Sequence, residues 1–411
     1  MNKPAAPRAT HVRATDLRAA GRLAVDATLG LTSLVENLHH NILRVPGPLG
    51  AVSEQPTGGI TGLVYRSIRG VTRLVGGSLD ALLGQVLTLL GPGDAPPSAE
   101  REAVLAALNG VLGDHLEATG NALAIPMTLR HAGSPLDIEV GALTRSSPLA
   151  KRRILLMVHG LCMNPQQWQR NGLDLGATLA AEGGSTLLHL HYNSGLHISD
   201  NGRRLADRLE ALRQAWPVPL DELVIIGHSM GGLVARSACH QASAHGDRWP
   251  QRLTKMVFLG TPHHGAPLER GGHWIDVILG ASPYTAAFAR LGKLRSAGIT
   301  DLRHGSLLDE DWAGADRYAH GHDRRTKVPL PEGVVCCTIA GSLGHEAGEL
   351  REKLLGDGLV PIDSALGFHK QQTRRLHFAP EHQWIGQGLS HLDLLAHADV
   401  LARLRAWLLV G

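Results

Sequence analysis

The segment from Asp221 to Arg236 constrains the fold more than any other part of the chain. It opens with the apolar run Leu-Val-Ile-Ile, continues as Gly-His-Ser-Met-Gly-Gly and ends in the helix-like run Leu-Val-Ala-Arg. Glycines two positions before and after Ser229 permit a very tight turn between a buried strand and a helix. Because such a turn lifts the hydroxyl out of the strand end, we predict that Ser229 is a nucleophile. The alternative is an ordinary glycine-rich loop.

Composition places the chain among soluble globular proteins. Its 411 residues are enough for one large domain with an appendage, or for two domains. A formal net charge of +3 is too small to indicate nucleic-acid binding, and no basic stripe interleaved with aromatic residues appears. We therefore expect no nucleic-acid partner.

The four cysteines are too few for a disulfide framework. Cys336 and Cys337 are adjacent in an apolar run, so a strand there would point them to opposite faces. The first twenty residues carry charges without an apolar core, which argues against a secretory signal. The sequence thus predicts reduced cysteines and a cytoplasmic protein, with peripheral membrane association left open.

Residues 1–120 are predicted to form an N-terminal helical region. Apolar residues recur at helical spacing over 16–43, 60–90 and 100–118. The uncharged part of the second helix is far shorter than the roughly 20 residues that a membrane span requires. Membrane docking, homo-oligomerisation and covering of an active site all remain open as tasks for this region.

Residues 121–411 show the alternation of strands and helices that predicts a doubly wound, mostly parallel sheet with helices on both faces. Strands are expected over 127–131, 138–143, 154–158, 186–192, 223–226, 256–259, 334–340 and 374–378. Helices are expected over 172–182, 201–215 and 392–409, with another that starts near Met230. Sites in such sheets lie at the carboxyl ends of the strands.

A cap or lid insertion is predicted at about 266–331, where the periodicity degrades. It contains apolar side chains that would suit an acyl-binding surface or, equally, packing against the sheet: Trp274, Ile275, Val277, Ile278, Leu279 and Phe288.

A serine nucleophile needs a base held by a carboxylate, and in this fold order both should follow it in the chain. Asp357 lies between two glycines after the strand expected over 334–340, and Asp363 is the reserve. His391 comes after the last expected strand, where its side chain can reach back over the sheet end. The rival bases are His369, His377 and His382.

The oxyanion of an acyl-transfer reaction needs N–H donors close to the nucleophile. Two backbone groups are predicted to supply them: the N–H of Met230, directly after the serine, and that of Leu161, directly after His159-Gly160. His159 itself is expected to hold its loop rather than to act as a base.

Taken together, the motifs resemble the α/β-hydrolases, and within them the bacterial lipases and the branch that includes GPI-inositol deacylases. The matching runs are Val-His-Gly-Leu at 158–161, Gly-His-Ser-Met-Gly-Gly at 227–232, Thr-Pro-His-His-Gly at 261–265, Gly-Asp-Gly-Leu-Val-Pro at 356–361 and His-Leu-Asp at 391–393. The resemblance implies a serine carboxyl-ester hydrolase that acts through an acyl-enzyme. By position, Ser229 is the nucleophile, Asp357 the acid and His391 the base. Leu161 and Met230 become the oxyanion donors.

Some secreted lipases of this kind bind a structural calcium through an aspartate just after the catalytic histidine, a position that Asp393 matches. The second aspartate would stand where Cys337 stands instead. We therefore expect Asp393 to cap the last helix, and we predict neither metal nor cofactor.

The sequence thus predicts an esterase or lipase that acts on small-molecule or lipid acyl esters. One alternative is an acyltransferase or thioesterase with the same triad. The other is a non-catalytic protein that binds a membrane or partner on a hydrolase scaffold.

Overall fold

The computed structural model describes residues 19–24, 99–139, 143, 150–266, 296–314, 325–344 and 356–409. Contacts divide the chain into two compact units, residues 1–101 with 116–124, and residues 102–115 with 125–411. The boundary predicted at residue 120 stays a prediction. This division places residues 102–115 of the third predicted helix in the same unit as the sheet.

Only a small part of the first unit is described. Residues 19–24 are helical, and the side-chain amide of Asn121 donates a hydrogen bond to the carbonyl of Ala19 at 3.1 Å. The remainder of the helices predicted over 16–43 and 60–90 lies outside the described residues, as does most of the predicted cap, including its apolar side chains.

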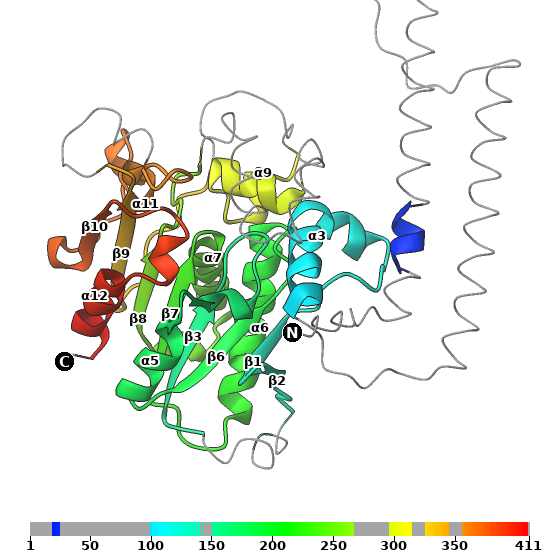
Figure 1. Ribbon diagram of the computed structural model, residues 1–411, viewed down its shortest axis with the longest axis horizontal. Coiled ribbons are helices and arrows are strands. Elements are labelled where there is room, and N and C mark those ends of the chain that lie inside the picture. The colour runs from blue at the N-terminus through cyan, green and yellow to red at the C-terminus, as the bar shows by residue number, and fades with distance from the viewer. Residues whose placement is uncertain are drawn as a thin grey trace, which may run out of the picture. The chain divides into compact units, whose positions relative to one another are not determined.

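The described residues of the second unit form an eight-stranded sheet (Figure 1). Its strands are β1 (Thr128–His131), β2 (Ser134–Pro135), β3 (Arg153–Val158), β6 (Thr186–His191), β7 (Glu222–His228), β8 (Leu253–Leu259), β9 (Val335–Ser342) and β10 (Gln383–Gln387). A separate two-stranded ribbon joins β4 (Gln169–Arg170) to β5 (Leu173–Asp174).

Strand order across the sheet is β10-β9-β8-β7-β3-β6-β1-β2. The pairs from β10 to β6 are parallel, and β1 joins β6 and β2 in antiparallel fashion. The strand that leads to Ser229, β7, lies in the middle of this order, between β3 and β8. This is the mostly parallel, doubly wound sheet of the α/β-hydrolase fold, so the predicted fold class is confirmed.

The described helices follow the sequence pattern closely. They are α3 (Ala99–Ala118), α5 (Leu175–Glu182), α6 (Ile198–Ala215), α7 (Met230–His245), α9 (Ala297–His304), α11 (Ile362–Ala365) and α12 (Ala398–Leu408). Short 3-10 helices are η1 (Pro165–Trp168), η2 (Trp249–Arg252), η5 (Asp309–Asp311), η6 (Gln372–Arg374), η7 (Pro380–His382) and η8 (Asp393–Leu395). Among these described parts, no helix is both long enough and apolar enough to cross a membrane.

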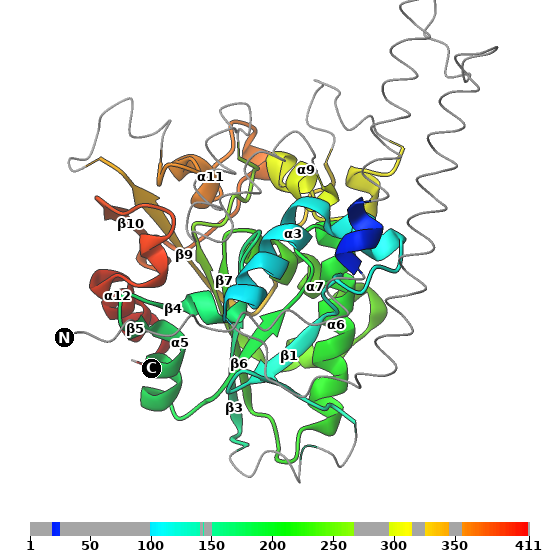
Figure 2. The ribbon, with the colours of Figure 1, turned by 45° about the vertical axis from the view of Figure 1, so that its right-hand side comes forward.

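Alternating side chains of the central strands belong to two hydrophobic cores, one on each face of the sheet. Ile154 and Leu156 of β3 pack with the apolar stripes of α6 and α7, whereas Leu155 and Met157 pack with those of α5 and α12. α5 and α12 lie side by side in both views of the ribbon (Figures 1 and 2). All four cysteines are buried and free.

The Cys336 side chain joins the α6–α7 core and that of Cys337 joins the α5–α12 core. The prediction that these two neighbours point to opposite faces is therefore confirmed.

Two predicted strands are wrong. Where the structure describes residues 138–143, they are not strand, because the hairpin from β1 turns at Ala132 and Gly133 and is followed at once by the two-residue β2. Residues 374–378 are not strand either; η6 and an irregular loop occupy them. The last strand is β10, and its Trp-Ile-Gly core is too short for periodicity to reveal.

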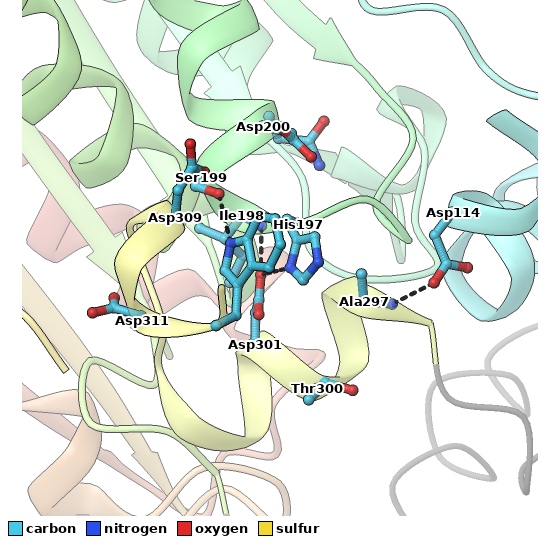
Figure 3. Close-up of polar contacts among 12 residues, drawn as sticks. Asp114, His197, Ile198, Ser199, Asp200, Ala297, Thr300, Asp301, Asp309 and Asp311 are labelled. Carbon is cyan, nitrogen blue, oxygen red and sulfur yellow. Dashed lines mark hydrogen bonds and ion pairs between the residues drawn. The ribbon is translucent and has the colours of Figure 1, made fainter. Parts of the chain in front are cut away.

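Helix α9 is fastened to the start of α6 by a buried carboxylate (Figure 3). The N-cap of α6, His197, makes no capping bond with its own side chain, and Asp301 of α9 supplies the acceptor instead. Asp301 Oδ2 accepts the N–H of Ile198 at 2.8 Å and lies 2.9 Å from His197 Nδ1. The His197 ring stacks on Trp312 at 3.7 Å between centroids. This part of the predicted cap, within residues 296–314, is thereby fixed to the start of α6.

Candidate active site

Ser229 occupies a strained turn between β7 and α7. Its φ of 53° and ψ of −123° lie in a region that non-glycine residues avoid, and its N–H donates to the carbonyl of Leu259 at 2.8 Å. A Cβ on Gly227 would lie 2.6 Å from the Cα of Gly232, and one on Gly231 would strike the carbonyl of Val158. The glycines around Ser229 are therefore required by close backbone contact.

His391 and Asp357 form a buried pair. The His391 Nδ1 to Asp357 Oδ2 distance is 2.6 Å, and both residues are 2% exposed. The other carboxylate oxygen, Oδ1, accepts the N–H groups of Leu359 and Val360 at 3.0 and 2.8 Å. The N–H of His391 also donates to the carbonyl of Asp357 at 3.0 Å. These contacts fix the ring with its Nε2 atom turned away from the carboxylate.

The turn at Ser229 and the ring of His391 meet at the end of β8. Leu259 accepts the N–H of Ser229, and a Cβ on the next residue, Gly260, would lie 3.0 Å from Cε1 of His391. His228 Nε2 lies 3.1 Å from the carbonyl of His391, so its N–H donates there. In the described part of the chain, Ser229 Oγ and His391 Nε2 are both buried without a hydrogen-bond partner.

The loop after β3 passes directly over the serine. A Cβ on Gly160 would lie 3.0 Å from Cβ of Ser229, so the adjacent N–H of Leu161 lies close to the same position. Met230 is the first residue of α7, and the N–H of a first helical residue has no partner within its helix. The structure thus brings both predicted oxyanion donors near Ser229.

Helix α3 supports this loop from behind. A Cβ on Gly110 would lie 2.9 Å from the Cα of Cys162, the residue after Leu161. Cys162 has a φ of 58°, and its N–H donates to Ser194 Oγ at 3.0 Å. Ser296 Oγ donates to the Gly110 carbonyl at 2.7 Å. The backbone near the predicted oxyanion site is therefore held by α3 and by the loop after β6.

His159 holds its own loop, as predicted. Its Nδ1 lies 2.9 Å from the carbonyl of Gly160, and its ring stacks on Tyr192 at 4.4 Å between centroids. The Tyr192 hydroxyl donates to the His159 carbonyl at 2.8 Å. Burial lowers the pKa of His159 to about 4, so its ring is neutral at pH 7.

The rival residues lie elsewhere. Asp363 in α11 and His377 are exposed, the His369 ring lies 4.9 Å from that of His264, and the His382 ring lies 6.5 Å from that of Trp407. None of these contacts involves Ser229, Asp357 or His391.

Two supporting residues escape sequence reasoning. His228 directly precedes Ser229 in the serine motif, and the sequence alone gives it no role. In the structure its Nε2–H donates a hydrogen bond to the His391 carbonyl. Asp393 was expected to cap the last helix, and this is wrong: Oδ2 accepts the N–H and hydroxyl of Ser390 at 2.9 and 2.5 Å, while His397 caps α12. The carboxylate of Asp393 thus stabilises the turn that carries His391. Across the described residues, no three His, Cys, Asp or Glu side chains gather as a metal site.

Comparison with known proteins gives one family match, to a domain of unknown function (DUF7379), over residues 134–302. No curated protein matches the sequence. Solved structures to which the chain is similar include lipases and esterases.

Three of these structures illustrate the range. A lipase from Bacillus licheniformis in its mature form shares 18% identity over 69% of this chain and 98% of its own, with a TM-score of 0.42. A lipase-esterase related protein from Clostridium acetobutylicum shares 11% identity over 69% and 98%, with a TM-score of 0.35. An esterase from Pyrococcus furiosus shares 13% over 64% and 82%, with a TM-score of 0.37. The fold assignment stands on the strand order and the turn at Ser229.

Proposed function

We propose that this protein is a serine ester hydrolase that acts through an acyl-enzyme. Ser229 Oγ attacks the acyl carbonyl while His391 Nε2 takes its proton, and Asp357 holds the imidazole in the tautomer that accepts it. The N–H groups of Leu161 and Met230 stabilise the oxyanion of the tetrahedral intermediate. His391 then gives the proton to the leaving alcohol, and water releases the acid in a second, equivalent cycle.

The observation that carries the proposal is the pairing of a buried His391–Asp357 contact of 2.6 Å with a strained serine turn at the same strand end. Most buried polar groups in folded proteins have a hydrogen-bond partner. Here the Nε2 atom of His391 and the hydroxyl of Ser229 are both buried and without a partner among the described residues. Strain and unpaired buried groups concentrate at functional sites.

The substrate class that we propose is an acyl ester of a small alcohol or a lipid. We further propose that the protein acts in the cytoplasm, because its four cysteines are buried and form no disulfide, as is typical of a reducing compartment.

The test is hydrolysis of activated esters of increasing acyl length by the wild type and two variants. His391→Ala should lower kcat by a factor on the order of 10⁴. His369→Ala, which removes a rival histidine outside the site, should leave kcat within about twofold. Equal losses in both variants, or none in either, would contradict the assignment of the base. Adding competing alcohols measures the acyltransferase alternative directly, since a transferase yields new ester in excess of free acid.

A further inference from the structure

A second site lies on the α7 face of the sheet, apart from the serine. Arg236 comes two turns after Ser229 along α7, which is about 10 Å at 1.5 Å per residue. It lines a cavity together with residues of the loop after β8, of segment 325–328 and of η6: His263, His264, Arg325, Lys327 and Arg374. No aspartate or glutamate is among the described residues that line this cavity.

Arg236 carries a buried charge, and among the described residues no carboxylate contacts it. The residue is 3% exposed, and its guanidinium donates to His263 Nδ1 at 3.2 Å and to the carbonyl of Val328. Burial lowers the pKa of Arg236 to about 10, which still leaves it protonated at neutral pH. Proteins rarely bury a charge without an opposite charge beside it, because the loss of hydration is large.

His263 adds a second unsatisfied donor. A guanidinium can only donate, so His263 Nδ1 accepts from Arg236, and the ring proton must reside on Nε2. His263 is 2% exposed, and neither its Nε2 atom nor Arg236 Nε has a hydrogen-bond partner in the described part of the chain. Two buried N–H donors on the cavity wall therefore lack an acceptor.

The remaining cations are fixed in place around the same space. Arg325 Nη1 donates to the carbonyl of Gly305 at 3.0 Å, and Arg374 Nη1 donates to the carbonyl of Arg325 at 2.9 Å. Lys327 is exposed, so the rim of the cavity reaches solvent. The cavity has a volume of about 30 Å³, whereas one water needs roughly 10–15 Å³. A small group with several oxygen atoms has room to enter.

We propose that this cavity binds a phosphate group. Arg325, Lys327 and Arg374 line the same cavity as the unpaired donors of Arg236 and His263, so the site favours an anion with several oxygen atoms. Guanidinium forks also match the oxygen spacing of phosphate and give charge-assisted hydrogen bonds. The oxygens would accept from Arg236 Nε and His263 Nε2, the two donors that have no partner among the described residues. This site does not depend on the chemistry at Ser229.

The experiment measures binding of inorganic phosphate to the full-length protein by calorimetry and thermal melting, at constant ionic strength set with sodium chloride. Sodium acetate at equal concentration serves as the carboxylate arm. Because Arg236 also holds Val328, the decisive variant is Lys327→Gln, which removes a charge from the exposed rim. Lys151→Gln is the matched control, since Lys151 is exposed and lies two residues before the start of β3.

The proposal predicts saturable binding and stabilisation by phosphate but not by acetate, weakened about fivefold or more in Lys327→Gln and unchanged in Lys151→Gln. Two further arms identify the source of the group. Glycerol phosphate that competes with inorganic phosphate indicates a soluble ester. Vesicles of phosphatidic acid in phosphatidylcholine that bind the wild type but not Lys327→Gln indicate a lipid headgroup. Equal effects of phosphate and acetate, or equal affinities in both lysine variants, would overturn the proposal.

Discussion

Replacing Gly110 by alanine should slow catalysis even though Gly110 lies in a helix remote from the reacting atoms. In an ordinary helix interior this change would stabilise the fold by about 1 kcal/mol, because alanine has the higher helix propensity. Here the new Cβ would lie 2.9 Å from both the Cα and the backbone N of Cys162, and closer still to its sulfur. Backbone atoms at that distance must move by several tenths of an ångström.

The expected size of the effect follows from these two opposing terms. Overpacking of this kind costs about 1–3 kcal/mol, so the free energy of unfolding should fall by roughly 0–2 kcal/mol. The shift moves Cys162 and with it the N–H of Leu161. Losing an oxyanion donor altogether lowers kcat by about 10²–10³, so a displaced donor should lower it by about tenfold to a hundredfold. KM should change little, because the loss falls on the transition state.

The assay compares kcat, KM and urea unfolding of Gly110→Ala with those of Gly176→Ala. Gly176 lies in α5 on the opposite face of the sheet, where the three atoms nearest to a Cβ belong to the side chains of Leu187, Met157 and Asp174, at 3.1, 3.2 and 3.5 Å. This control gains the same helix propensity without displacing backbone. A Gly110→Ala protein with kcat within twofold of the wild type would refute the role of α3 in holding the oxyanion loop.

Three further outcomes are expected. Ser229→Ala should abolish ester cleavage while leaving the melting temperature unchanged or slightly higher, because the lost hydroxyl is buried without a partner in the described structure. Removing residues 1–98 should leave the unit of residues 102–115 and 125–411 folded, whereas removing residues 1–115 should lower the melting temperature sharply, because residues 102–115 belong to the same compact unit as the sheet. Burial lowers the pKa of His159 from 6.5 to about 4, so the unfolded state takes up a proton first as pH falls. The stabilisation is complete above pH 6.5 and fades by about 3 kcal/mol toward pH 4, and a chemical-denaturation series measures this loss, which His159→Gln should reduce.

The fold was predictable because the strands of the central sheet are buried on both faces and read as continuous apolar runs. β3 and β7 are the clearest cases, and their turns carry the glycines that the tight geometry demands. β10 was missed because its five residues are short, half-buried and interrupted by Gly386. The run at 374–378 resembles a strand, yet the preceding residues form η6 and leave it outside the sheet.

Within the candidate site, the contact between Asp357 and His391 follows from chain order and flanking glycines. The hydrogen bonds that support this contact and the nearby loops do not follow from the sequence. His228, Ser194 and Asp393 contribute through their position relative to distant backbone, and a polar residue in a loop gives no sign of which carbonyl or N–H it will reach. Likewise, the task of α3 against Cys162 depends on contacts between segments about fifty residues apart, which periodicity cannot reveal.

The central claim is that Ser229 is an activated nucleophile. Reacting the purified full-length protein with a fluorophosphonate and mapping the adduct by mass spectrometry tests it most directly. We expect a single stoichiometric adduct on Ser229, absent from Ser229→Ala and formed at least a thousandfold more slowly by His391→Ala. An adduct on another residue, or labelling of Ser229 at the same rate without the imidazole of His391, would contradict the account.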